Sequence, residues 1–173
     1  MDYLLTGEES KRLYFRKVEP SDFASWLPFH EDPSSTEYWP QSNLKPNEAC
    51  QKWFDTVFYR YDNNLGGFNA LIDKNTGEFI GQCGLLIQTV DNVQELEIGY
   101  SLLPASRNKG YAIEAARKCK SFAFDKNLAH SLISIIHSEN KPSQNVAIKN
   151  GMSLDKTTVY NDIPVNIFRV ISH

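Results

Sequence analysis

Apolar and polar residues alternate most regularly between Gln94 and Leu102. One face of this run carries Leu96, Ile98, Tyr100 and Leu102, and the other carries Glu95, Glu97, Gly99 and Ser101. A period of two residues is typical of a strand with one buried face. Shorter apolar runs predict strands at 13–18, 68–73, 79–89 and 130–137, and a closing hairpin formed by 157–160 and 164–171.

Two longer segments repeat their apolar residues at the spacing of a helix. The first begins at Pro46 and ends near Asp62, with a stripe of Ala49, Cys50, Trp53, Phe54, Val57, Phe58 and Tyr61. The second follows Gly110, with a stripe of Ala112, Ala115, Ala116, Cys119, Phe122 and Ala123. Each is long enough to cover one face of a sheet.

Prolines and glycines set the limits of two shorter helices. One starts at Pro20 and is expected to end at Pro28, and the other lies between Pro142 and Gly151. The segment 33–46 is rich in proline, serine and asparagine, which predicts a long loop. The order of elements gives an antiparallel meander followed by a right-handed strand-helix-strand crossover. We therefore expect one domain over 1–173, an α/β fold with a mixed, mostly antiparallel sheet and helices on its faces.

Composition narrows the class of protein. The 173 residues are 41% hydrophobic and 23% charged, with a formal net charge of -3, so no global attraction to nucleic acid or to an anionic membrane is expected. No signal peptide or membrane span is predicted. Cys50, Cys83 and Cys119 have neither the spacing of a zinc site nor an even count, which suggests buried thiols in a reducing compartment, the cytoplasm.

The junction between the strand 94–102 and the helix after Gly110 has the features of an anion site. The first amides of a helix lack internal partners and lie at the positive end of its dipole. Gly110 allows close approach to the backbone, and Arg107 and Lys109 add positive charge. A phosphate or a pyrophosphate is the ligand that this arrangement indicates.

Two common phosphate motifs fit poorly. A kinase-type P-loop would continue from Gly-Lys to Ser or Thr, whereas Gly110 is followed by Tyr111 and Ala112. A dinucleotide fingerprint would need three glycines, and one is present. A nucleotide-dependent phosphotransferase is therefore disfavoured.

Two motifs in order resemble the GNAT superfamily of N-acetyltransferases, and more narrowly its ribosomal-protein N-terminal acetyltransferase-like (RimJ/RimL-like) branch. The first is strand, [Gln/Arg]-x-x-Gly-x-[Gly/Ala], helix, which is met by Arg107, Gly110 and Ala112. The second runs from Asn140-Lys141-Pro142-Ser143 to Lys149-Asn150-Gly151-Met152. The resemblance begins near Arg12 and covers most of the chain.

The resemblance implies the acyl-CoA N-acyltransferase fold and acetyl-CoA as cosubstrate, without a metal. In such proteins two parallel strands splay and the pantetheine arm pairs with exposed backbone, which here implies Tyr100, Leu102 and Leu103. The pyrophosphate would contact a loop made of Arg107, Asn108, Lys109, Gly110, Tyr111 and Ala112. Asn140 would position a cofactor amide.

Two residues become candidates for catalysis by the same resemblance. Glu97 matches a strand glutamate that deprotonates the amine, often through water, although Glu95 on the same face competes for this role. Many members protonate the departing thiolate with a tyrosine on the last helix, but Ala147 occupies that position. In the RimJ/RimL-like branch a serine three residues after the asparagine takes the place of the tyrosine, which implies Ser143 here. Ser143 would donate a proton to the thiolate or stabilise it by a hydrogen bond. A serine is also common in the first turn of a helix, without any catalytic role.

The acceptor is the least defined part of the prediction. Tyr38 and Trp39 lie in the long loop and either line the acceptor site or anchor the loop to the core. The acceptor is either a protein N-terminus, which the branch resemblance slightly favours, or a small-molecule amine, and a homodimer is left open. A non-catalytic acyl-CoA sensor on the same fold is the alternative. The four histidines have no metal-ligand spacing.

Overall fold

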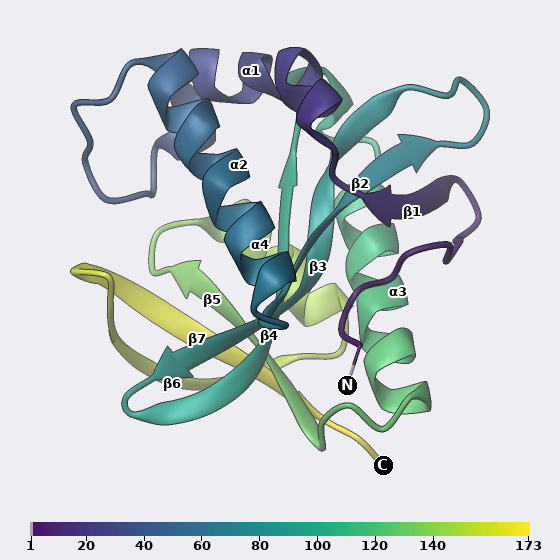
Figure 1. The fold of residues 1–173 in the computed structure, drawn as a ribbon. Helices are drawn as coiled ribbons and strands as arrows, with labels where there is room; N and C mark the ends of the chain where they lie inside the picture. The colour runs from purple at the N-terminus through teal and green to yellow at the C-terminus, as the bar shows by residue number, and fades with distance from the viewer. Residues whose placement is uncertain (1) are drawn as a thin grey trace.

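A computed structural model describes residues 2–173. One seven-stranded sheet has the order β1-β2-β3-β4-β5-β7-β6. The strands are β1 (Leu13–Lys17), β2 (Gly66–Asp73), β3 (Phe79–Val90), β4 (Val93–Leu102), β5 (Ser131–His137), β6 (Ser153–Tyr160) and β7 (Ile163–Ile171). All neighbours are antiparallel except β4 and β5, which are parallel (Figure 1). The predicted mixed sheet is confirmed.

Helices cover both faces of this sheet. They are α1 (Phe23–Glu31), α2 (Pro46–Asp62), α3 (Tyr111–Asp125) and α4 (Lys141–Lys149). On one face α1 and α2 pack over Ala70 of β2, and on the other α3 packs over Leu71, the next residue of that strand. Alternation along β2 thus builds two hydrophobic cores, one on each side of the sheet.

The parallel strands β4 and β5 share very little backbone. They pair at a single position, with Glu97 opposite Ile133. Beyond it the hydroxyl of Ser134 donates to the carbonyl of Ile98 at 3.0 Å, so a side chain replaces a ladder bond. The sheet therefore opens between the C-terminal halves of β4 and β5, as the resemblance implied.

Two tight turns complete the framework. Asp91 and Asn92 between β3 and β4, and Asn161 and Asp162 between β6 and β7, all have positive φ values of 47 to 66°. Two consecutive residues of this kind form the type I′ turn, whose twist matches that of a hairpin. The second turn brings Tyr160 and Asn161, at the tip of the β6–β7 hairpin, to a cavity that α2 also lines.

The expectation that Pro28 ends the first helix is wrong. A short 3-10 turn (η1, Pro20–Asp22) leads into α1, which continues through Pro28 to Glu31. Proline removes one helical hydrogen bond, but Trp26 and Phe29 on either side of it are buried and their rings stack 4.4 Å apart. Packing of these aromatic residues outweighs the local cost.

The other local expectations need smaller changes. The loop 33–46 contains a 3-10 turn (η2, Pro33–Thr36), and another (η3, Pro104–Ser106) lies between β4 and α3. The three cysteines are free and buried, as predicted, and the sulfurs of Cys83 and Cys119 are 3.5 Å apart. Among residues 2–173, no helix is both long and apolar enough to cross a bilayer.

Candidate functional site

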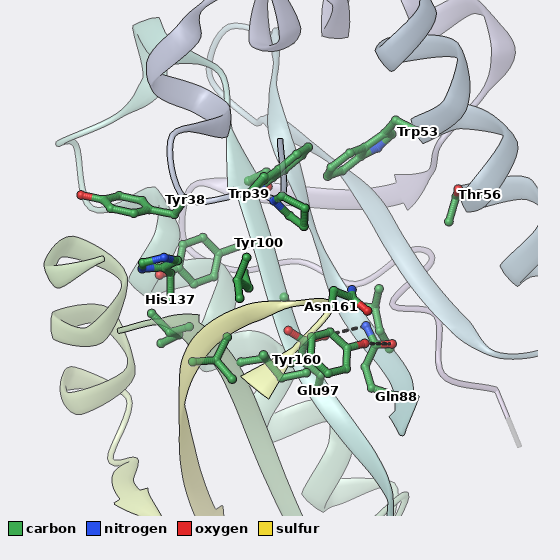
Figure 2. A pocket seen from close by; sticks show the side chains of 18 of the residues that line it. Tyr38, Trp39, Trp53, Thr56, Gln88, Glu97, Tyr100, His137, Tyr160 and Asn161 are labelled. Atoms are coloured by element: carbon green, nitrogen blue, oxygen red, sulfur yellow. Dashed lines mark hydrogen bonds between the residues drawn. The ribbon is translucent and has the colours of Figure 1, made fainter. Parts of the chain in front are cut away.

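A cavity of about 660 Å³ lies where the sheet opens. Its walls come from α2, the loop 38–44, the facing halves of β4 and β5, the start of α4 and the tip of the β6–β7 hairpin. Six of the residues singled out from the sequence line it, namely Tyr38, Trp39, Glu97, Tyr100, Asn140 and Ser143. Segments distant in sequence therefore meet around one space (Figure 2).

Glu97 lies at the base of this cavity. It points away from the core face of β4, and its carboxylate accepts a hydrogen bond from Gln88 Nε2 at 2.9 Å and another from the amide of Ile135. Burial raises the pKa of Glu97 from 4.5 to about 7, against these two bonds and the charge of Arg60, which lower it. A carboxyl group with a pKa near neutrality accepts and releases protons readily.

The partners of Glu97 form a network that sequence reasoning missed. Gln88 Oε1 accepts from Arg60 Nη2 at 2.9 Å. The same oxygen accepts from the Tyr160 hydroxyl at 3.0 Å (Figure 2). The only signal in the sequence that could have indicated Gln88 is its polar side chain in an otherwise mostly apolar strand. Tyr160 is more than 60 residues from Glu97 in the chain, and only the fold brings it here.

Glu95, the competing candidate, lies in a different environment. Both of its oxygens bind Arg169, at 2.6 and 3.0 Å, and it does not line the cavity. The ion pair ties β4 to β7 across β5. Of the two glutamates, Glu97 alone is placed beside the cavity.

The backbone of β4 is open toward the gap at alternate residues. The Leu103 amide donates to Ile80 of β3, whereas the Ile98 and Leu102 carbonyls point the other way, to Ser134 and Arg107. Since both backbone groups of a strand residue point to one side, Tyr100 and Leu102 face the gap and Leu103 does not. Leu103 thus has no free amide for a ligand lying in the gap.

At the start of α4, Asn140 and Ser143 are joined by a hydrogen bond. Asn140 caps the helix by accepting from the Ser143 amide at 3.3 Å, and the Ser143 carbonyl lies 3.5 Å from the Tyr100 hydroxyl. Burial raises the pKa of Tyr100 to about 12, so it remains protonated and a donor. Ser143 lines the cavity, and its backbone amide and carbonyl make the contacts to Asn140 and Tyr100.

The loop from Arg107 to Ala112 lies outside this cavity, at the N-terminus of α3. Gly110 has φ +80° and precedes the helix, and Asn108, Lys109 and Gly110 are exposed. The first helical bond runs from the Glu114 amide to Gly110, which leaves the amides of Tyr111 and Ala112 without a helical acceptor. These amides are the groups expected for an anion site.

The cations around the loop are arranged differently from the expectation. Arg107 donates to the hydroxyls of Ser34 at 2.9 Å and Ser35 at 2.6 Å, so it ties η2 to the end of β4. Arg12 instead reaches the loop: its guanidinium donates to the Lys109 carbonyl at 2.8 Å, lies 4.2 Å from the centre of the Tyr111 ring and forms an ion pair with Glu114 at 2.7 Å. Arg12 and Lys109 are thus the cations beside Gly110.

Residues 12–153 match the model of the acetyltransferase (GNAT) domain. The chain belongs to the GNAT family.

Individual proteins agree with this assignment. The chain is 34% identical over 161 residues to the protein YkkB of Bacillus subtilis, with 91% of each sequence covered. Its fold is similar to an acetyltransferase from Agrobacterium tumefaciens, with a TM-score of 0.81, 23% identity and coverage of 99% of this chain and 98% of the other. The GNAT prediction made from two short motifs is confirmed.

The narrower resemblance is supported at the level of the fold. RimL, described as a ribosomal L7/L12 alpha-N-protein acetyltransferase in complex with coenzyme A, superposes with a TM-score of 0.75 at 16% identity, covering 95% of this chain and 97% of its own. The chain therefore shares the architecture of the RimJ/RimL-like branch, and acetyl transfer is the activity that the description of the matching family model names.

Proposed function

We propose that this GNAT protein transfers the acetyl group of acetyl-CoA to a primary amine, by direct transfer in a ternary complex. The observation that supports it best is the position of Glu97, a carboxyl group with a pKa of about 7 beside the opening of the sheet. A group at this place is suited to take a proton from an ammonium at neutral pH.

The chain also offers contacts for two parts of coenzyme A, the pantetheine arm and the diphosphate. Backbone groups of Tyr100 and Leu102 face the gap, where a pantetheine arm adds hydrogen bonds like an extra strand. The amides of Tyr111 and Ala112, with Gly110 before them, suit the diphosphate. We assign the neighbouring positive charge to Lys109, because the guanidinium of Arg12 is paired with Glu114 and that of Arg107 is bonded to two serines.

In the proposed reaction the amine nitrogen bonds to the acetyl carbon while the carbon-sulfur bond breaks. Glu97 accepts the first proton of the ammonium and passes it to solvent, and the second proton of the nitrogen ends on the sulfur. A free amide of β4 polarises the thioester carbonyl. Ser143 donates a hydrogen bond to the thiolate, and Asn140, whose oxygen caps α4, keeps its side-chain amide for the cofactor.

The setting of the reaction follows from the thiols. Cys50, Cys83 and Cys119 are free and buried, and burial raises the pKa of Cys50 to about 11. Free thiols persist in reducing compartments, so we place the protein in the cytoplasm.

Replacing Gly110 by valine tests coenzyme binding, because a Cβ there would lie 3.2 Å from the Arg12 guanidinium at the N-terminus of α3. Gly77 is a matched control, since it has a similar φ of +76° and an added Cβ would have no atom within 4 Å. We expect Gly110→Val, but not Gly77→Val, to abolish the heat of acetyl-CoA binding in calorimetry. Equal binding by both variants would contradict the assignment of this loop.

A thiol-release assay on the wild type then separates catalysis from sensing. Release of coenzyme A that depends on an added amine supports transfer. Tight binding of acetyl-CoA with no amine-dependent release would instead support an acyl-CoA sensor.

A further inference from the structure

The acceptor side of the cavity has an unusual amount of aromatic surface. Trp39 stacks on Trp53 at 5.6 Å with an angle of 9° between the rings, and Trp53 stacks on Phe68 at 5.0 Å and 18°. The indole nitrogen of Trp53 donates to the buried Gln82 at 3.0 Å, which fixes the middle ring. These three rings form a wall that does not depend on a ligand for its shape.

This wall continues to the mouth of the cavity, where apolar side chains remain uncovered. Trp39 is 38% exposed and Leu44, from the same loop, is 42% exposed. One side of the Trp39 ring packs against Phe29 and His30 of α1, which holds the indole in place at this lip. An apolar lip of this kind gains free energy when a ligand covers it.

The opposite side of the same space carries the Tyr160 ring beside Glu97. Figure 2 shows the indoles of Trp39 and Trp53 on one side and Tyr160, with Asn161, on the other. The Tyr160 hydroxyl donates to Gln88, so its ring is held while its polar end is satisfied. A flat group placed between these surfaces would have its attached amine near Glu97.

Charge around the cavity limits the acceptor to one positive group. Among the described residues that line it, Glu97 is the only carboxylate, whereas Lys52 and Arg60 are both cationic. His30, buried among Trp26, Phe29 and Trp53, has a pKa lowered to about 4 by burial and adds no charge at neutral pH. A second ammonium on the acceptor would meet like charge.

We propose that the acceptor is an arylalkylamine, a small monocation whose aromatic ring lies between the Trp39–Trp53 wall and Tyr160 and whose amino group reaches Glu97. This inference rests on the proposed function and names its substrate class. The cavity also has to receive the end of the pantetheine arm, so its 660 Å³ leave room for a small molecule of this size.

The test compares kcat/KM for four acceptors with acetyl-CoA. 2-Phenylethylamine should exceed its saturated counterpart 2-cyclohexylethylamine by roughly 2- to 10-fold, the range expected for ring stacking beyond burial of area. It should also exceed spermidine and a tripeptide that begins with phenylalanine. Preference for spermidine, for the peptide or for the saturated ring would overturn the inference and leave acetyl transfer standing.

A pair of variants locates the ring. Trp39→Ala should lower kcat/KM for 2-phenylethylamine by roughly 10-fold or more while leaving the affinity for coenzyme A unchanged. Tyr59→Ala is the control and should have no effect, because Tyr59 is an exposed aromatic residue of α2 that does not line the cavity. Equal behaviour of the two variants would refute the position of the ring.

Binding is measured separately, so that the two proposals fail in different ways. Calorimetric titration of 2-phenylethylamine into the coenzyme A complex should give saturable binding that Trp39→Ala weakens. Absence of binding overturns the aromatic acceptor, whereas binding without any acetylation overturns the proposed transfer.

Discussion

Glu97→Gln should change how stability depends on pH. In the wild type the pKa of Glu97 is about 7 when folded and near 4.5 when unfolded. Between these values the folded protein holds a proton that the unfolded chain has released, so stability is present below pH 4.5 and is lost as pH rises to 7. A difference from 4.5 to about 7 corresponds to about 3 kcal/mol.

Glutamine cannot ionise, and its oxygen still accepts from Gln88. Glu97→Gln should therefore remove this pH-dependent loss and make the protein more stable than the wild type at pH 8 by about 2 kcal/mol, after allowing for partial relaxation. At pH 4 the two proteins should have nearly equal stability. A substitution that stabilises the fold while it slows turnover is expected where a functional site holds an unfavourable charge.

Urea unfolding without ligand at pH 5 and pH 8 measures the effect. Glu95→Gln is the control. It also removes a carboxyl group from this face of β4, but the Glu95 carboxylate pairs with Arg169 and does not line the cavity. In turnover assays, Glu97→Gln should lower kcat by about 100-fold or more and abolish the inflection near pH 7. Parallel pH dependences of stability in the wild type and Glu97→Gln would refute the reasoning.

Three further substitutions test other parts of the site. Gln88→Leu removes a hydrogen bond that lowers the pKa of Glu97, so the acidic limb of the kcat/KM profile should move to higher pH; an unchanged profile would exclude this role. Arg107→Ala frees η2 from the end of β4, and we expect KM for the amine to rise roughly 5-fold, with the calorimetric affinity for acetyl-CoA retained. Ser143→Ala should lower kcat by about 10-fold without changing the melting temperature, because its structural contacts are made by backbone groups; full activity would remove it from the mechanism.

The fold was largely predictable because its signals are local. Alternation along 94–102 and helical spacing after Gly110 each depend on neighbouring residues, and both elements are observed within a few residues of the expected ends. Pro28 was misjudged because the compensation comes from aromatic packing between residues of α1 and α2. A rule about one residue cannot include such contacts.

The site was predictable only in part. Glu97 and Ser143 could be named because a motif fixes their positions along the chain, and the structure places both at the cavity. Tyr160 reaches Gln88 through a hairpin whose path is set by tertiary packing, and no local pattern indicates that. Arg107 was predicted as a cation of the phosphate-binding loop, but its long side chain reaches Ser34 and Ser35 in the structure.

Because β4 and β5 pair at one position, the sheet consists of two parts, β1-β2-β3-β4 and β5-β7-β6, with a gap between them. A molecule that lies in this gap and bonds to both strands would take the place of the missing backbone pairing. Binding of the cosubstrate would then make the two parts of the sheet more rigid relative to one another. Amide exchange at Tyr100 and Leu102 should then slow when coenzyme A is added, while the amides of the antiparallel ladder between β2 and β3 keep their exchange rate.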